Sequence, residues 1–185
     1  MTDEERIQAA WVGDPPKLTG KIELAKYDPG WPDLFDREAI RIRHVLGEAV
    51  ILVEHVGSTS VPRLAAKPVI DILLVLPAPG DEATYAPALE AAGYRMVIRE
   101  PDWYEHRVFK GPDTNINLHV HPPDSPEIAR MIDFRDHLRV HDDDRLLYES
   151  EKRRLAARDW DYVQSYADAK TEVVEAIIAR AQSKG

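Results

Sequence analysis

Residues 68–76 read PVIDILLVL, and this stretch decides the kind of fold that the chain can adopt. Nearly all of these residues are apolar and several are β-branched, which is typical of a strand covered on both faces. A strand covered on both faces needs helices above and below its sheet. The sequence therefore predicts a single α/β domain of the α+β kind, in which a mixed β-sheet is flanked by helices.

Further strands and helices are predicted on both sides of this stretch, from alternating runs and from apolar residues at helical spacing. The expected strands are 49–56, 68–76, 94–99, 103–110 and 115–120, with a short extended piece at 21–25. The expected helices are 3–10, 32–47, 81–92, 125–140, 143–157 and 160–182. Residues 127–184 contain neither proline nor glycine, which predicts a helical C-terminal layer.

Length and charge limit the classes of function. The chain has 185 residues, which favours one domain, and we expect residues 1–19 to be an N-terminal extension of a domain at 20–185. It carries 24 Lys and Arg against 33 Asp and Glu, for a formal net charge of −9. An acidic chain is a poor candidate for general nucleic-acid binding or for an anionic membrane. A local basic pocket remains compatible with this charge.

The cellular location is predicted from what the sequence lacks. The absence of Cys excludes disulfides, thiolate metal sites and cysteine nucleophiles. The sequence has no apolar run of about 18 residues, and its start, MTDEERIQ, does not resemble a signal peptide. We therefore expect a cytoplasmic protein. The sequence leaves the oligomeric state open.

A turn rich in hydroxyl groups lies at residues 55–62, which read HVGSTSVP. Gly57 allows the backbone to approach a ligand closely, and the hydroxyl groups of Ser58, Thr59 and Ser60 suit phosphate oxygens. The turn lacks the Gly-Lys-Ser/Thr ending of a Walker A loop. Two interpretations remain, a phosphate-binding turn and an ordinary polar turn between two elements.

Asp71 lies inside the apolar strand predicted at 68–76. Burial of a carboxylate is costly unless the group is paired, protonated or bound to a metal. Asp71 is therefore a candidate catalytic residue, which would hold a metal or orient a hydroxyl nucleophile as a general base. The alternative is a structural Asp that only accepts hydrogen bonds.

The segment 115–121 reads NINLHVH and alternates strictly between apolar and polar residues. Asn117, His119 and His121 therefore share one face of the predicted strand, close enough together to line one pocket. Neutral imidazoles at His119 and His121 can bind a divalent metal, and they can also act as acid–base groups. The alternative is an ordinary strand that faces solvent.

Three cations lie within apolar stripes of the predicted C-terminal helices, namely Arg135, Lys152 and Lys170. Arg139 is one turn beyond Arg135. Since a buried cation needs an anionic partner, one interpretation is a pocket that binds a polyanion such as nucleotide phosphates. In the alternative interpretation, the long side chains of these cations lie along the edge of the core or pair with carboxylates.

The remaining candidates come from other segments. On the predicted strand 103–110, Glu105 and Arg107 share a face, whereas His106 points to the other face. We expect two further cations of the phosphate site, Lys67 and Arg107. We also expect further residues that line the pocket, namely His55, Glu105, Asn117 and Tyr148.

These segments resemble the GrpB family, and the resemblance covers about residues 20–182. It rests on residues 55–62, 66–72, 117–121 and 134–139, and on the helices that carry Tyr148, Lys152 and Lys170. The GrpB family is grouped with the nucleotidyltransferase superfamily and its polymerase-beta-like fold. The resemblance thus implies a nucleotidyltransferase-like architecture. Some relatives are fused to dephospho-coenzyme A kinase, which implies a nucleotide or coenzyme A context.

The resemblance also implies an activity. In that superfamily a Gly-Ser motif precedes a strand with two carboxylates, a third carboxylate lies on a nearby strand, and two Mg²⁺ ions assist phosphoryl chemistry. Gly57, Ser58 and Asp71 match this pattern, but Leu73 occupies the second carboxylate position and residues 115–121 supply no third carboxylate.

The implied ligand is a nucleotide or another phosphorylated small molecule, and the implied reaction is transfer of a nucleotidyl group to a small acceptor. A divalent metal, Mg²⁺ or Mn²⁺, is the candidate cofactor, with Asp71, His119 and His121 as candidate ligands. Two alternatives stay open, a non-catalytic ligand-binding module and a single-metal hydrolase that uses the His119/His121 pair.

Overall fold

The computed structural model describes residues 2–18 and 20–183 of the chain. Its centre is a five-stranded sheet with the order β1-β2-β5-β4-β3. The strands are β1 (Leu52–Val56), β2 (Ile70–Val75), β3 (Arg95–Glu100), β4 (His106–Lys110) and β5 (Ile116–His121). β2 and β5 run parallel, and the other neighbouring strands in this order are antiparallel. The prediction of a mixed sheet is confirmed.

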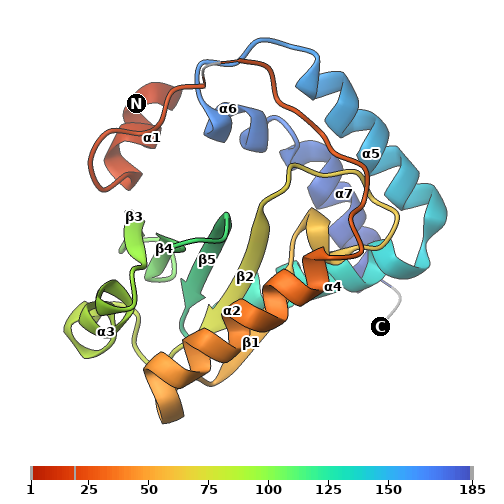
Figure 1. The fold of residues 1–185 in the computed structure, drawn as a ribbon. Coiled ribbons are helices and arrows are strands. Elements are labelled where there is room, and N and C mark those ends of the chain that lie inside the picture. Colours follow the sequence, from red (N-terminus) through yellow and green to blue (C-terminus); the bar gives the residue numbers. More distant parts are fainter. Residues whose placement is uncertain (1, 19, 184–185) are drawn as a thin grey trace.

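Helices lie on both sides of the sheet, as Figure 1 shows. They are α1 (Asp3–Ala10), α2 (Trp31–Leu46), α3 (Ala86–Ala91), α4 (Pro126–Val140), α5 (Asp142–Ala156), α6 (Val163–Asp168) and α7 (Thr171–Gln182). The predicted helical C-terminal layer is therefore present. None of the helices in the described residues has the length and hydropathy needed to cross a bilayer.

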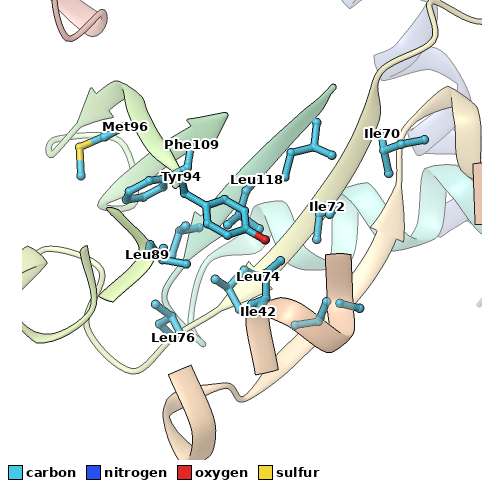
Figure 2. Close-up of a cluster of buried hydrophobic side chains, with 14 of the residues drawn as sticks. Ile42, Ile70, Ile72, Leu74, Leu76, Leu89, Tyr94, Met96, Phe109 and Leu118 are labelled. Atoms are coloured by element: carbon cyan, nitrogen blue, oxygen red, sulfur yellow. The ribbon is translucent and has the colours of Figure 1, made fainter. Parts of the chain in front are cut away.

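The two faces of β2 are buried by different helices. Ile72 and Leu74 belong to the main core cluster beneath α2 and α3, where Figure 2 shows them beside Leu118. Leu73 and Val75 point to the opposite face and pack against apolar residues of α4. The prediction of a strand covered on both faces is confirmed, and its polar residue, Asp71, lies on the α4 side beyond the area that α4 covers.

The helix predicted at 160–182 is two helices, α6 and α7, with a break at residues 169–170. The side-chain hydroxyl of Thr171 donates a hydrogen bond to the carbonyl oxygen of Asp168 at 2.6 Å. Such a local bond gives the backbone an alternative to helical hydrogen bonding. The absence of proline and glycine was therefore not sufficient to predict a continuous helix.

Two other predicted elements are shorter than expected. The helix predicted at 81–92 is a 3₁₀ turn at Glu82–Thr84 followed by α3, because Pro87 is compatible only with the first turn of a helix. The strand predicted at 103–110 begins only at His106. Tyr104 and Glu105 have positive φ angles of 50° and 49°, which a strand does not allow.

Candidate functional site

A cavity of about 1090 Å³ lies over the α4-side face of the sheet, beyond α4 itself. Its floor includes Asp71 on β2 and Asn117 and His119 on β5. Its walls come from the turn after β1, from α5 and α6, and from the N-terminal segment. The volume matches that of pockets that enclose small-molecule ligands.

The turn after β1 bends sharply at Gly57, where φ is +70°. Of the three hydroxyl residues that follow, Ser58 lines the cavity. Thr59 is buried and donates to the carbonyl of Val69 at 3.3 Å, and Ser60 donates to the carbonyl of Gly57 at 2.5 Å. Ser58 thus has access to a ligand, whereas Thr59 and Ser60 stabilise the turn.

Asp71 accepts hydrogen bonds within the floor of the cavity. Its Oδ1 atom lies 2.9 Å from Asn117 Nδ2 and 3.4 Å from His119 Nε2. Lys110 Nζ in turn donates to Asn117 Oδ1 at 2.5 Å. Burial opposes ionisation of Asp71, but the hydrogen bonds from His119 and Asn117 and the charge of Lys67 outweigh it and hold the Asp71 pKa below its usual range. Asp71 is therefore a carboxylate at neutral pH.

A chain of hydrogen bonds extends from Asp71 across the sheet to β3. His119 Nδ1 lies 3.2 Å from His106 Nε2, and His106 Nδ1 lies 2.7 Å from Glu100 Oε2. Burial lowers the pKa of His106, so its imidazole is neutral and carries one proton. Because Nδ1 faces a carboxylate, that proton lies on Nδ1, and Nε2, which faces His119, carries no proton.

Three lysines converge at one end of the cavity. Lys152 is 2% exposed and donates to Ser58 Oγ at 3.1 Å and to the carbonyl of Ala65. Lys67 Nζ and Lys170 Nζ lie 5.5 and 4.6 Å from the centre of the Tyr166 ring. Within residues 2–18 and 20–183, these lysines form no ion pair with a carboxylate.

The close approach of these ammonium groups changes their proton affinity. Burial, together with the charge of Lys170, lowers the pKa of Lys152 to about 7 and that of Lys67 to about 8. Burial and the neighbouring charge both disfavour the charged form of these lysines, and a bound anion would oppose both effects. The arrangement is therefore suited to an anionic group placed among the three lysines.

Arg107 and Glu105 lie away from the cavity. Side chains alternate along β4, so Arg107 points to the opposite face, where it is 3% exposed and donates to Glu82 Oε1 at 2.5 Å. Glu105 accepts a hydrogen bond from the backbone N–H of Gly80 at 3.2 Å. The cavity face of β4 belongs instead to His106.

The arginines of α4 support the turn after β1. Arg135 donates to Glu54 Oε2 at 2.6 Å and to the carbonyl of His55 at 3.0 Å. Arg139 donates to the carbonyl of Ser60 at 2.9 and 3.0 Å. The guanidinium groups thus bind protein oxygens and do not line the cavity.

The other candidate lining residues are internal. The His55 ring stacks on Phe35 with centroids 5.0 Å apart, and its Nε2 atom lies 2.9 Å from Thr59 Oγ1. His121 is fully buried, and its Nδ1 atom lies 3.2 Å from Ser125 Oγ. Tyr148 packs between helices, with the Lys152 ammonium 4.9 Å from its ring centre.

The side chains around Asp71 do not fit a two-metal site. Leu73, at the position of the second carboxylate, is fully buried against α4. His121 is turned toward Ser125, and His119 contacts Asp71 directly. In the part of the chain that the structure describes, no group of three His, Asp or Glu residues is placed to hold a metal ion.

Comparison with known proteins identifies the family. A family model described as GrpB protein matches residues 21–180. The chain belongs to the GrpB family. A UPF0157 protein of Halalkalibacterium halodurans is 57% identical over 182 residues, which cover 98% of this chain and 93% of that protein. The crystal structure of the conserved protein GrpB from Enterococcus faecalis has a TM-score of 0.77 and 31% identity, and the match covers 88% of this chain and 98% of that one.

A shorter match links this GrpB-family chain to an enzyme with a named activity. A dephospho-CoA kinase of Mycobacterium bovis is 38% identical over 74 residues. The match covers 38% of this chain and 18% of the kinase. It therefore concerns a small part of that enzyme.

Sequence reasoning missed several residues of this GrpB cavity. Lys110 shares the cavity face with His106, and period-two alternation from His106 through Val108 would have found it. Tyr166 lies on α6 and Lys170 lies in the break before α7, so the contact of Lys67 and Lys170 with the Tyr166 ring follows from the tertiary structure. Glu100 has no distinctive pattern around it, and only the pairing of β3 with β4 brings it to His106.

Proposed function

We propose that the cavity binds a nucleotide or another phosphorylated small molecule. The observation that carries this proposal is that Lys67, Lys152 and Lys170 line one cavity together with Ser58, without a carboxylate ion pair among the described residues. Buried ammonium groups are stable only with an anionic partner, and phosphate oxygens accept several charge-assisted hydrogen bonds at once. The partial match to a dephospho-CoA kinase supports a phosphorylated ligand.

We further propose that the reaction at this site is transfer of a nucleotidyl group to a small acceptor. Asp71 is ionised, and its Oδ2 atom lies beside Gly57, next to the turn that carries Ser58. As general base, Asp71 would take the proton of the acceptor hydroxyl while the new O–P bond forms and pyrophosphate leaves.

A second candidate function is a ligand-binding module without catalysis. The specific observation in its favour is Leu73, whose apolar side chain is buried where a second carboxylate would be needed. A protein of this kind would keep the lysines and Ser58, and it would bind the same ligands without turnover.

Calorimetry with ATP and with inorganic tripolyphosphate, each with and without Mg²⁺, tests the binding proposal. We expect both compounds to bind, and we expect the double variant Lys67→Met/Lys170→Met to bind about tenfold more weakly or worse. Lys26→Met is the matched control, since Lys26 is exposed and does not line the cavity. Absence of binding to the wild-type protein, or equal binding by the double variant, would overturn the proposal.

Pyrophosphate release from ATP, followed by ³¹P NMR with a panel of small hydroxyl acceptors, separates the two candidates. If the wild-type protein releases pyrophosphate and Asp71→Asn does not, the result supports nucleotidyl transfer. Binding of ATP without any release supports the binding module.

A further inference from the structure

The N-terminal segment, residues 2–18, lies across the cavity, although the family match begins only at residue 21. On one side it extends the sheet. The backbone N–H of Val12 donates to the carbonyl of Val97 on β3 at 2.9 Å, and Trp11 forms a β-bridge with Ile98.

On its other side the segment contacts the residues that lead into α6. The backbone N–H of Leu18 donates to the carbonyl of Asp161 at 2.9 Å, and the Tyr162 hydroxyl donates to Glu4 Oε1 at 2.9 Å. Figure 1 shows α1 near α6, above the β3 end of the sheet. The segment is thus held at both sides and forms part of the cavity wall.

The wall at the β3 end contains a cluster of apolar side chains. Ile7 and Trp11 line the cavity from the N-terminal segment, and Val97 and Ile98 line it from β3. Trp11 is only partly buried and lines the cavity. An apolar wall with an accessible aromatic ring is suited to a flat, weakly polar group.

The two ends of the cavity lie at different strands. Asp71 is on β2, whereas Val97 and Ile98 are on β3, three strand spacings away in the order β2-β5-β4-β3. At about 4.8 Å per spacing this separation is roughly 14 Å. Asn117 and His119, on the intervening β5, present polar side chains on the floor between the ends.

A nucleotide matches the order of lysines, polar floor and apolar wall along the cavity, because it joins phosphates, a hydroxyl-bearing sugar and a flat base in one extended molecule. We propose that the N-terminal segment is the base-binding wall of the site, with Trp11 packed against the base of a nucleotide whose phosphates lie among Lys67, Lys152 and Lys170. This inference rests on the proposed function and deepens it. It assigns selection of the base to residues outside the family match.

Calorimetry on Trp11 variants tests this inference, with ATP and inorganic tripolyphosphate as the two probes. We expect Trp11→Ala to bind ATP at least about tenfold more weakly than the wild-type protein, because it loses the stacking surface, and to bind tripolyphosphate equally well. Trp11→Leu keeps an apolar side chain and provides a second variant if the alanine variant does not fold. Val12→Ala is the matched control, since Val12 is exposed, adjoins Trp11 and does not line the cavity.

The outcomes separate this inference from the proposed function. Loss of ATP affinity in the Trp11 variants, with retained tripolyphosphate affinity, supports the base-binding wall. Unchanged ATP affinity in both Trp11 variants would overturn it and leave the phosphate site intact. Equal weakening of both probes would also overturn it, because the wall would then act on the phosphates. Failure of the wild-type protein to bind either probe would refute the proposed function itself.

Discussion

Gly57 lies directly against Asp71, and this contact brings the hydroxyl-bearing turn to the carboxylate. A Cβ atom at Gly57 would lie 2.9 Å from Asp71 Cβ and 3.0 Å from Asp71 Cγ, closer than non-bonded carbon atoms approach. The backbone there has a φ of +70°, a conformation that favours glycine. Gly57 thus has two independent reasons to be glycine, its positive φ and its close contact with Asp71.

Gly57→Ala is expected to lower the free energy of unfolding by about 1–3 kcal/mol, from backbone strain and from the contact with Asp71. Urea denaturation measures this change. Gly20→Ala is the control, because no heavy atom lies near the position of its Cβ and its φ is not positive, and its effect should stay within about 0.5 kcal/mol. Equal effects of the two substitutions would contradict the role of Gly57.

Arg107→Ala is expected to destabilise the fold without weakening anion binding. Arg107 is buried on the face opposite the cavity, and its loss leaves Glu82 with Arg99 as its remaining partner. We expect a loss of about 1–3 kcal/mol in unfolding free energy. Tripolyphosphate affinity, measured at a temperature where the variant is folded, should equal that of the wild-type protein. A large loss of affinity would show that Arg107 acts in the site after all.

Anion affinity is expected to fall as the pH rises from about 7 to about 8. In the free protein, burial and the charge of Lys170 lower the pKa of Lys152 to about 7 and that of Lys67 to about 8. Both lysines are therefore protonated below this range and neutral above it, and an anion binds the protonated form. Tripolyphosphate itself gains negative charge over the same range, so a decrease in affinity reports the lysines.

The measurement is calorimetry of tripolyphosphate binding from pH 6 to pH 9. Lys152→Met provides the comparison, since it removes the group with the lowest pKa among these lysines. Its affinity should be weaker at pH 6 and should vary less between pH 6 and pH 8. An affinity of the wild-type protein that stays constant or rises with pH would contradict the prediction.

The neutral ring of His106 is expected to carry its proton on Nδ1, because Glu100 Oε2 lies 2.7 Å from that atom. Burial lowers the pKa of His106, so the ring should stay neutral at pH 7. Long-range ¹H–¹⁵N NMR distinguishes the two tautomers. In Glu100→Leu the acceptor is absent, and the proton should move to Nε2. An Nε2-protonated ring in the wild-type protein would contradict donation from His106 Nδ1 to Glu100.

Local periodicity was enough to predict which residues share a face. The alternation in residues 115–121 correctly placed Asn117 and His119 together, because successive side chains in any strand point to opposite faces. The same rule placed Arg107 opposite His106. It did not reveal which of these two faces carries the cavity, since that depends on the helices that cover each side.

The boundaries of some elements were predicted less well than their existence. The break between α6 and α7 lies where the Thr171 hydroxyl donates to the carbonyl of Asp168. The late start of β4 depends on the left-handed backbone of Tyr104 and Glu105. Neither feature has a simple pattern in the sequence.

By itself, the sequence determined the mixed α/β architecture and the strand that carries Asp71, because these follow from hydrophobic patterns within short segments. The tertiary structure decided how the site is assembled. The parallel pairing of β2 with β5 sets Asp71 opposite Asn117, 46 residues further along the chain, and α5 brings Lys152 to Ser58 across 94 residues. Contacts of this range depend on how whole elements pack. A local pattern therefore cannot specify which cation faces the cavity and which one pairs with a carboxylate of the protein.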